Sequence, residues 1–224
     1  MYITEDEVYA SGTLGDALFI LLKVVGTPVR KINHFSAHKS AYPLIKQIYS
    51  MCPHISVTML DKKTPARYVT GHLRDYELYT AYPSLHLSHR YEGKLPYNFN
   101  VLQLKSGLND PARRLSIKDI ANLEKSQTYV LIGTDKMPLE MLQGYDILDL
   151  RNKTSLIECF SIIARAQRFY GPQGLMAFFA LSQKVKSYIY LKTESDRVAV
   201  NARIKKVTEW KDYVTLIGYE RGYR

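Results

Sequence analysis

Apolar and polar residues in the first sixty positions switch between two spacings. The segment EVYASG, positions 7–12, alternates and then stops at a glycine, which predicts a strand that enters a turn. DALFILLKVVG, positions 16–26, has apolar residues at helical spacing and ends at a glycine, which predicts a helix. PVRKINHFS, SAYPLIKQIYSMCP and HISVTML then predict a strand, a short helix and a strand. This alternation indicates a mostly parallel sheet.

The same alternation returns in the second half of the chain. Strands are predicted at FNVLQLKSG, TYVLIG, YDILDLR, RFYGPQG and KSYIYLK. Helices are predicted at SIKDIANLEKS, with Ser116 as N-cap, at TSLIECFSIIARAQ, capped by Thr154 or Ser155, and at LMAFFALSQKV.

A loosened stretch, rich in Tyr and His, separates the two halves and is broken by Pro83, Gly93 and Pro96. We interpret residues 93–98 as a linker. The sequence therefore predicts an α/β protein with two Rossmann-like domains facing across a cleft. Their predicted bounds are 1–95 and 96–195, followed by a basic, aromatic C-terminal segment, 196–224, that packs back on the body.

Composition and charge narrow the class of partner. Hydrophobic residues make up 46% of the 224 positions and charged residues 23%, which is typical of a folded protein. The formal net charge of +10 favours polyanionic partners such as nucleic acid, anionic lipid surfaces or nucleotide-linked substrates, without choosing among them. The C-terminal segment interleaves basic residues with Trp and Tyr, as clamps for nucleic acid do, but no recognised nucleic-acid-binding motif is present.

Several kinds of chemistry find no support in the sequence. Cys52 and Cys159 stand in unrelated contexts, which argues against a disulfide framework and fits a reducing cytoplasm. The six histidines have no spacing typical of metal ligands, so we expect neither a metal nor a cofactor. The N-terminus lacks the pattern of a signal peptide, and the longest apolar runs are far shorter than the ~18 residues of a membrane span. A G-x-S-x-G elbow is also missing.

A glycine turn follows the first predicted strand and contains Gly12, Thr13, Gly15 and Asp16. It lacks the third glycine of G-x-G-x-x-G and the Lys-Ser/Thr of a P-loop, and a carboxylate there would repel a phosphate. Two interpretations of Asp16 stay open. It is either a helix-start residue stabilised by the helix dipole, or a general base that accepts a proton from an attacking hydroxyl.

Two further turns in the second half are candidates for ligand binding. QLKSGLNDPARRLS gathers cationic side chains around a short loop that could hold a diphosphate, although a solvated basic loop is the alternative. YGPQGLMAFFALS starts a helix at glycines that allow a ligand to approach closely, although tight strand-to-helix packing explains them equally well.

These three turns carry a family resemblance. SGTLGDALFILLKV resembles the amino-terminal G-x-x-G-D signature of the lipopolysaccharide heptosyltransferase-like glycosyltransferases of the ADP-heptose type. DLRNKTSLIECFSIIARAQRFYGPQG resembles their carboxyl-terminal block, and VLQLKSGLNDPARRLS resembles the start of their second domain. The resemblance implies a shortened, divergent glycosyltransferase B-type fold that needs no metal, with a nucleotide-sugar donor on the second domain and an acceptor on the first.

The resemblance also implies roles for individual residues. Asp16 matches the catalytic base, in an acceptor loop with Gly12, Thr13 and Gly15. Arg113 or Arg114 stands where the family has a lysine that steadies the donor diphosphate. The full predicted donor-binding set is Lys105, Ser106, Gly107, Arg113, Arg114, Thr154, Ser155, Gly171, Gln173 and Gly174.

The sequence departs from the family pattern at one block. Pro172, Gln173 and Gly174 stand where the family has Asp-Ser-Gly, and Ala177 replaces a following His. Our leading hypothesis is a glycosyltransferase that moves a sugar from a nucleotide-sugar donor to an anionic acceptor, either a lipopolysaccharide-type glycan or DNA with a hydroxylated base. The departures favour the alternative of a catalytically inactive nucleotide-sugar binding protein. The C-terminal segment favours a third alternative, a nucleic-acid-binding module.

Overall fold

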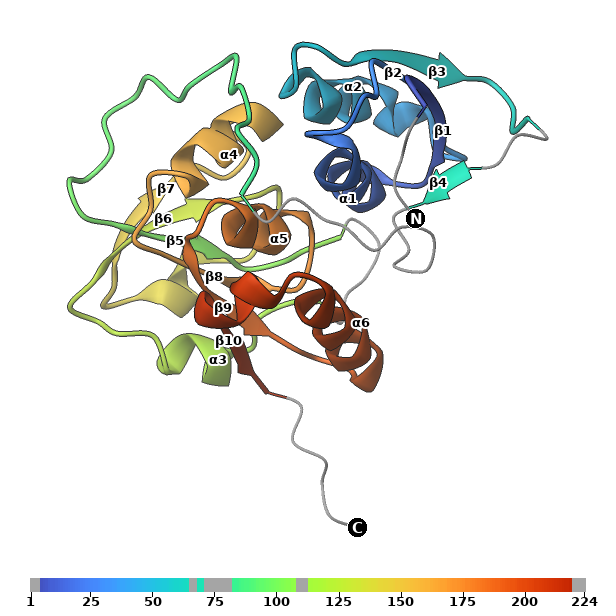
Figure 1. The fold of residues 1–224 in the computed structure, drawn as a ribbon. Helices are drawn as coiled ribbons and strands as arrows, with labels where there is room; N and C mark the ends of the chain where they lie inside the picture. Colours follow the sequence, from blue (N-terminus) through green and yellow to red (C-terminus); the bar gives the residue numbers. More distant parts are fainter. Residues whose placement is uncertain (1–4, 65–67, 71–81, 108–112, 219–224) are drawn as a thin grey trace. The chain divides into compact units, whose positions relative to one another are not determined.

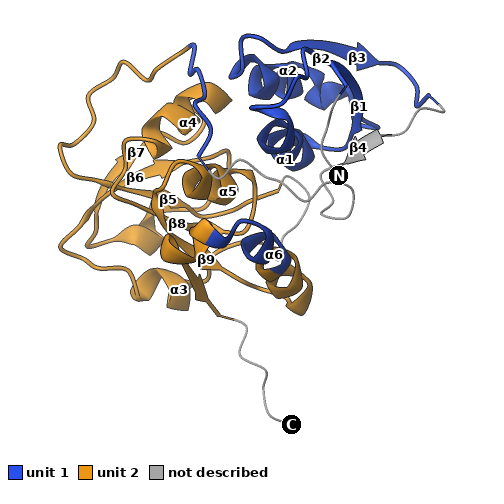
Figure 2. Cartoon of the chain, viewed as in Figure 1, with its two compact units in different colours: residues 1–88, 202–208 blue, residues 89–201, 209–224 orange. Residues whose placement is uncertain are grey.

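The computed structural model describes residues 5–64, 68–70, 82–107 and 113–218 (Figure 1). The chain forms two compact units (Figure 2). Unit 1 comprises residues 1–88 and 202–208, and unit 2 comprises residues 89–201 and 209–224. Each unit is therefore assembled from two separate stretches of the sequence. Among the described residues, no helix combines the length and apolarity that a membrane span requires.

Unit 1 contains a four-stranded parallel sheet with the order β3-β2-β1-β4. Its strands are β1 (Glu7–Ser11), β2 (Lys31–Phe35), β3 (Ser56–Leu60) and β4 (Tyr68–Thr70). Its helices are α1 (Leu14–Val24), the short 3-10 helix η1 (Lys39–Ala41) and α2 (Tyr42–Ser50). The predicted alternation is confirmed for this half, whereas β4 lies in the stretch that had no predicted strand. Every residue of α1 from Ala17 to Val24 is buried, which explains the apolar run from Ala17 to Leu22.

Unit 2 contains a six-stranded parallel sheet with the order β10-β9-β8-β5-β6-β7. Its strands are β5 (Asn100–Gln103), β6 (Thr128–Ile132), β7 (Asp146–Asp149), β8 (Arg168–Pro172), β9 (Lys186–Tyr190) and β10 (Val214–Ile217). Its helices are α3 (Ile117–Ala121), η2 (Leu139–Leu142), α4 (Leu156–Ile163), α5 (Leu175–Ser182) and η3 (Thr208–Asp212). Helix α6 (Glu194–Lys206) contributes residues to both units.

The strand order of unit 2 is that of a doubly wound Rossmann sheet. The chain starts in the middle at β5, moves outward to β7, returns to β8 and moves outward again to β10. The segment after residue 195 supplies most of α6 and all of β10, and β10 pairs in parallel with β9. Trp210 is fully buried, with its ring 6.0 Å from that of Phe178, so it is not available to stack on a base.

The helix starts of unit 2 follow from local sequence. Ser116 caps α3 and Ser155 caps α4, and each accepts a hydrogen bond from a backbone N–H in the first turn. In both helices an acidic side chain three positions on accepts a hydrogen bond from the backbone N–H of the cap residue, which makes a capping box. The predicted cap at Ser116 is confirmed, and of the two residues predicted for α4 the cap is Ser155. Such caps typically contribute ~1 kcal/mol each.

Candidate functional site

The carboxyl ends of β5 and β8 meet at the centre of the unit 2 sheet, where the direction of winding reverses. In open parallel sheets this reversal separates the two loops and leaves a crevice, in which ligands bind. The loop after β5 contains Ser106 and Gly107, and the loop after β8 contains Gln173 and Gly174. The second and third predicted turns therefore belong to one switch point.

A direct contact joins these two loops. The Ser106 hydroxyl donates a hydrogen bond to the backbone carbonyl of Gln173 at 2.5 Å, and both residues are buried. Gly174 lies so close that a Cβ placed on it would be 2.9 Å from Cβ of Ser106 and 3.1 Å from its Oγ. The close contact with Ser106 therefore requires glycine at position 174, and the hydrogen bond from the Ser106 hydroxyl links the two loops.

A buried carboxylate extends this contact to a third crossover. Asp196, in the first turn of α6, is 3% exposed and accepts a hydrogen bond from Nε2 of Gln173 at 2.9 Å. Nε of Arg113 lies 3.3 Å from the same Asp196 oxygen, Oδ1. The backbone N–H of Asp196 donates to Oγ1 of Thr193, which anchors the start of the helix. Asp196 was not among the residues predicted from the sequence.

The basic loop after β5 is closed by backbone pairing at its two ends. Lys105 and Arg114 form an antiparallel bridge, and the N–H of Ser106 donates to the carbonyl of Arg113 at 3.0 Å. Arg114 is exposed, and the Arg113 side chain is 34% exposed. The backbones at the two ends of this loop are thus held together, while residues 108–112 of the same loop lie outside the described part.

Thr154 and Ser155 lie at the start of α4, beyond the end of β7. The Thr154 hydroxyl bonds to the Leu150 carbonyl at 3.3 Å and lies 3.2 Å from Sγ of Cys159, so it holds the turn together. The N–H of Ser155 donates to Glu158 at 2.7 Å, and this bond is the main reason why the pKa of Glu158 lies below its usual value. The polar side chains of both predicted donor residues therefore have structural partners.

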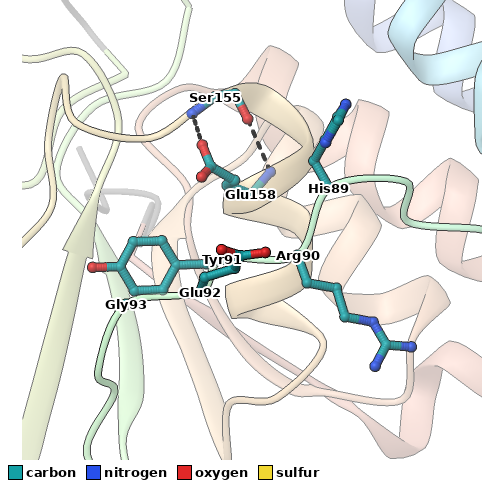
Figure 3. Close-up of a pocket in the computed structure, with 7 residues that line it drawn as sticks. All are labelled: His89, Arg90, Tyr91, Glu92, Gly93, Ser155 and Glu158. Atoms are coloured by element: carbon teal, nitrogen blue, oxygen red, sulfur yellow. Dashed lines mark hydrogen bonds between the residues drawn. The ribbon is translucent and has the colours of Figure 1, made fainter.

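A pocket of about 450 Å³ lies beside this helix start. It is lined by Ser155, Glu158 and the segment 89–93, which is held against α4 by a bond from the Tyr91 N–H to Oγ of Ser161 at 2.9 Å. Figure 3 shows Ser155 and Glu158 joined by two hydrogen bonds, with the side chains of Tyr91 and Arg90 extending in opposite directions. The volume is in the range of small-molecule pockets.

Gly171 lies inside β8 and not in the turn that follows it. A Cβ at this position would lie 2.9 Å from the Phe169 ring and 3.2 Å from Cβ of Gln103 on the neighbouring strand. Its geometry matches the tight-packing alternative, because the missing side chain lets Phe169 and Gln103 approach.

A buried ionic cluster next to the switch point also escaped the sequence analysis. The Arg151 guanidinium binds both carboxylate oxygens of Asp149 at 3.0 Å and Oδ1 of Asp135 at 2.8 Å. Burial alone would raise the pKa of Asp149, but the bonds from Arg151 outweigh it and lower that pKa. The cluster holds the loops after β6 and β7 together, at the same edge of the sheet as the switch point.

In unit 1, Asp16 lies at the third position of α1. Its Oδ2 accepts hydrogen bonds from the N–H of Thr13 at 2.8 Å and from the Thr13 hydroxyl at 3.1 Å. Gly12 has φ +137°, and a Cβ on it would lie 2.4 Å from Cβ of Asp16, so only glycine fits. Gly15 lies in the first turn of α1 with open space around it. The helix-start interpretation of Asp16 therefore matches its geometry, and its Oδ1 takes no part in these bonds.

A buried histidine contacts the backbone of the turn that contains Gly12. His34 is fully buried, its Nε2 lies 3.1 Å from the Gly12 carbonyl, and its Nδ1 lies 2.8 Å from the Tyr49 hydroxyl. Because a carbonyl can only accept, Nε2 carries the proton and the Tyr49 hydroxyl donates to Nδ1. Burial lowers the pKa of His34, against smaller opposing effects of the Gly12 carbonyl and Asp16. The imidazole is thus a neutral support for the loop. Within the described ranges, no group of three or more His, Cys, Asp or Glu could hold a metal ion.

The fold is similar to that of known glycosyltransferases. A glycosyltransferase family 9 structure from Veillonella parvula DSM 2008 matches with a TM-score of 0.60 and 12% identity, over 100% of this chain and 90% of that one. The dodecameric iron-containing heptosyltransferase TibC in complex with ADP-D-beta-D-heptose matches with a TM-score of 0.50 and 15% identity, over 85% of this chain and 59% of that one. No protein-family model and no curated protein matches the sequence. At these identities the similarity establishes the predicted α/β fold with parallel sheets, and any function has to be argued from the residues.

Proposed function

We propose that this protein is a glycosyltransferase that moves a sugar from a nucleotide-sugar donor to a hydroxyl group of an anionic acceptor. The observation that carries the proposal is the switch point of the Rossmann sheet, where Ser106, Arg113, Gln173 and Gly174 come together. A crevice at this position is where such sheets bind nucleotides. The fold similarity to glycosyltransferase family 9 and the bound ADP-heptose of TibC support a nucleotide-sugar as the donor.

In the proposed reaction, Asp16 accepts the proton of the acceptor hydroxyl as its oxygen attacks the anomeric carbon of the sugar. The bond between that carbon and the diphosphate oxygen breaks, and the nucleoside diphosphate leaves with the electron pair. Cationic side chains of the loop after β5 stabilise the charge that develops on the diphosphate. On the family resemblance, the proposal includes a donor site on unit 2, an acceptor site on unit 1, the two-domain B-type arrangement and no requirement for a metal.

A ligand screen followed by a turnover assay tests this proposal. Saturation by a nucleoside diphosphate at a hundred times its Kd should stabilise the protein by ~2.7 kcal/mol and raise its melting temperature. ADP, UDP, GDP and CDP are compared first, and the matching nucleotide-sugars are then incubated with DNA and glycan acceptors, with and without EDTA. Product masses are read by mass spectrometry. If none of the diphosphates raises the melting temperature, the donor site is refuted.

The same experiment separates the alternative of an inactive binding protein. In the turn that replaces the family's Asp-Ser-Gly, the side-chain amide of Gln173 donates to Asp196, an arrangement that supplies no carboxylate from positions 172–174. Binding of a nucleotide-sugar with no transfer to any acceptor would favour this alternative. Salt-dependent DNA binding without binding of a nucleotide would instead favour the nucleic-acid-binding module.

A further inference from the structure

Four residues at the switch point form a closed ring of contacts. The Ser106 N–H donates to the Arg113 carbonyl, and the Ser106 hydroxyl donates to the Gln173 carbonyl. The Gln173 side chain donates to Asp196, whose Oδ1 lies 3.3 Å from Nε of Arg113. The ring joins the loops after β5, β8 and β9, so both the backbone and the side chain of Arg113 are held at this edge of the sheet.

The two charges in this ring differ in their exposure. The Asp196 side chain is 3% exposed, whereas that of Arg113 is 34% exposed. A buried carboxylate is stable only where it is paired and hydrogen-bonded; here Gln173 donates the hydrogen bond and Arg113 provides the ion pair. The ion pair with this carboxylate lies on the Nε side of the guanidinium and restrains the direction in which the Arg113 side chain extends.

We propose that Asp196 is a positioning residue that orients the Arg113 guanidinium to bind the diphosphate group of the donor. This inference rests on the proposed function, because it assigns the binding of the diphosphate to one arginine of the loop after β5. A planar guanidinium binds phosphate oxygens best when its fork is already oriented, since less side-chain entropy is lost on binding. Gln173 completes the arrangement by donating to the carboxylate, a bond that a second carboxylate could not provide.

Charge and positioning predict opposite effects for Asp196→Asn. The substitution removes a negative charge beside Arg113, so long-range attraction alone predicts equal or tighter binding of an anion. If Asp196 orients Arg113, the same substitution weakens binding. We expect the Kd of the best-binding nucleoside diphosphate, and that of inorganic diphosphate, to rise at least tenfold in Asp196→Asn.

Isothermal titration of purified full-length protein with ADP, UDP, GDP, CDP and inorganic diphosphate tests the inference. Asp146→Asn is the matched control, because it makes the same charge change in unit 2 at the amino end of β7, where the Asp146 side chain accepts a bond from Thr128. Its Kd should equal that of wild type. The double variant of Asp196→Asn with Arg113→Gln should bind no more weakly than Arg113→Gln alone, because the carboxylate acts through the arginine.

Arg113→Lys provides a test that does not depend on how Asp196 variants fold. It keeps the charge on a partly exposed residue but removes the Nε contact, so we expect a loss of affinity close to that of Arg113→Gln. Wild-type affinity in Arg113→Lys or Asp196→Asn, or effects that multiply in the double variant, would overturn the inference while leaving the proposed function intact. Failure of wild type to bind any of the diphosphates would overturn both.

Discussion

Replacing Gly174 by alanine tests whether the contact between the two switch-point loops is as close as described. The backbone at this position is extended, which alanine can adopt, so the effect comes from the added methyl group. That group would lie 2.9 Å from Cβ of Ser106, whereas carbon atoms pack without strain at roughly 3.5–4.0 Å. Overpacking of this kind costs typically ~1–3 kcal/mol.

Relief of the overlap would have a further consequence. Ser106 would have to move away from Gln173, and its 2.5 Å hydrogen bond would weaken, which costs about 1 kcal/mol more. Alanine also makes the unfolded chain less flexible than glycine does, which stabilises the folded state by ~0.4–1 kcal/mol. We therefore expect Gly174→Ala to lower the free energy of unfolding by ~1–3.5 kcal/mol, measured from urea denaturation followed by circular dichroism.

Two further variants make the experiment specific. Gly15→Ala is the matched control, because a Cβ there meets no atom within 4 Å, and we expect no loss of stability. Ser106→Gly removes both atoms that the new methyl group would contact, so in its background Gly174→Ala should cost much less. The reasoning is refuted if Gly174→Ala is as stable as wild type, or if its cost is unchanged in the Ser106→Gly background.

Three more predictions concern single groups. Asp16→Asn keeps an oxygen that can accept from Thr13, so it should change the unfolding free energy by less than ~1 kcal/mol but lower the transfer rate ~10²–10⁴-fold, and an equally active variant would exclude Asp16 as the base. Burial lowers the pKa of His34, so the unfolded chain binds more protons in acid than the folded chain, and the free energy of unfolding should fall as the pH drops below about 6.5. Urea midpoints should show a less steep fall in His34→Gln. Burial raises the thiol pKa of Cys52 and Cys159, so both should react far more slowly with Ellman's reagent in the native than in the unfolded protein, and a fast native thiol would contradict their burial.

Much of the fold could be predicted because local pattern and tertiary structure agree in it. The run from Ala17 to Leu22 is apolar and buried, and Ser116 and Ser155 combine a capping side chain with an acidic partner three residues on. β4 was missed, since three residues within a stretch rich in Tyr and His offer too short a pattern. From the sequence, the C-terminal segment could be described only as basic and aromatic. No bounds of a helix could be predicted there, because α6 has many charged residues and shows no apolar stripe.

The candidate site was predictable only in part. Glycines and basic residues mark turns locally, so Gly174, Lys105 and Arg113 could be singled out from the sequence. Asp196 could not, because its partner Gln173 is 23 residues away and Arg113 comes from another crossover. The pairing of Arg151 with Asp135 likewise depends on two loops that only the sheet brings together. A side chain whose role is set by distant partners leaves no periodic signal in the sequence.

The late position of β10 and of residues 202–208 bears on how the protein is made. As the chain leaves the ribosome, β9 emerges with one open edge, which stays unpaired until residues 214–217 follow. Unit 1 likewise waits for residues 202–208 before it is complete. An unpaired strand edge readily recruits strands from other chains. Stalled synthesis within α6 would therefore leave both units unfinished at once, and nascent chains at that stage would depend on chaperones to stay apart.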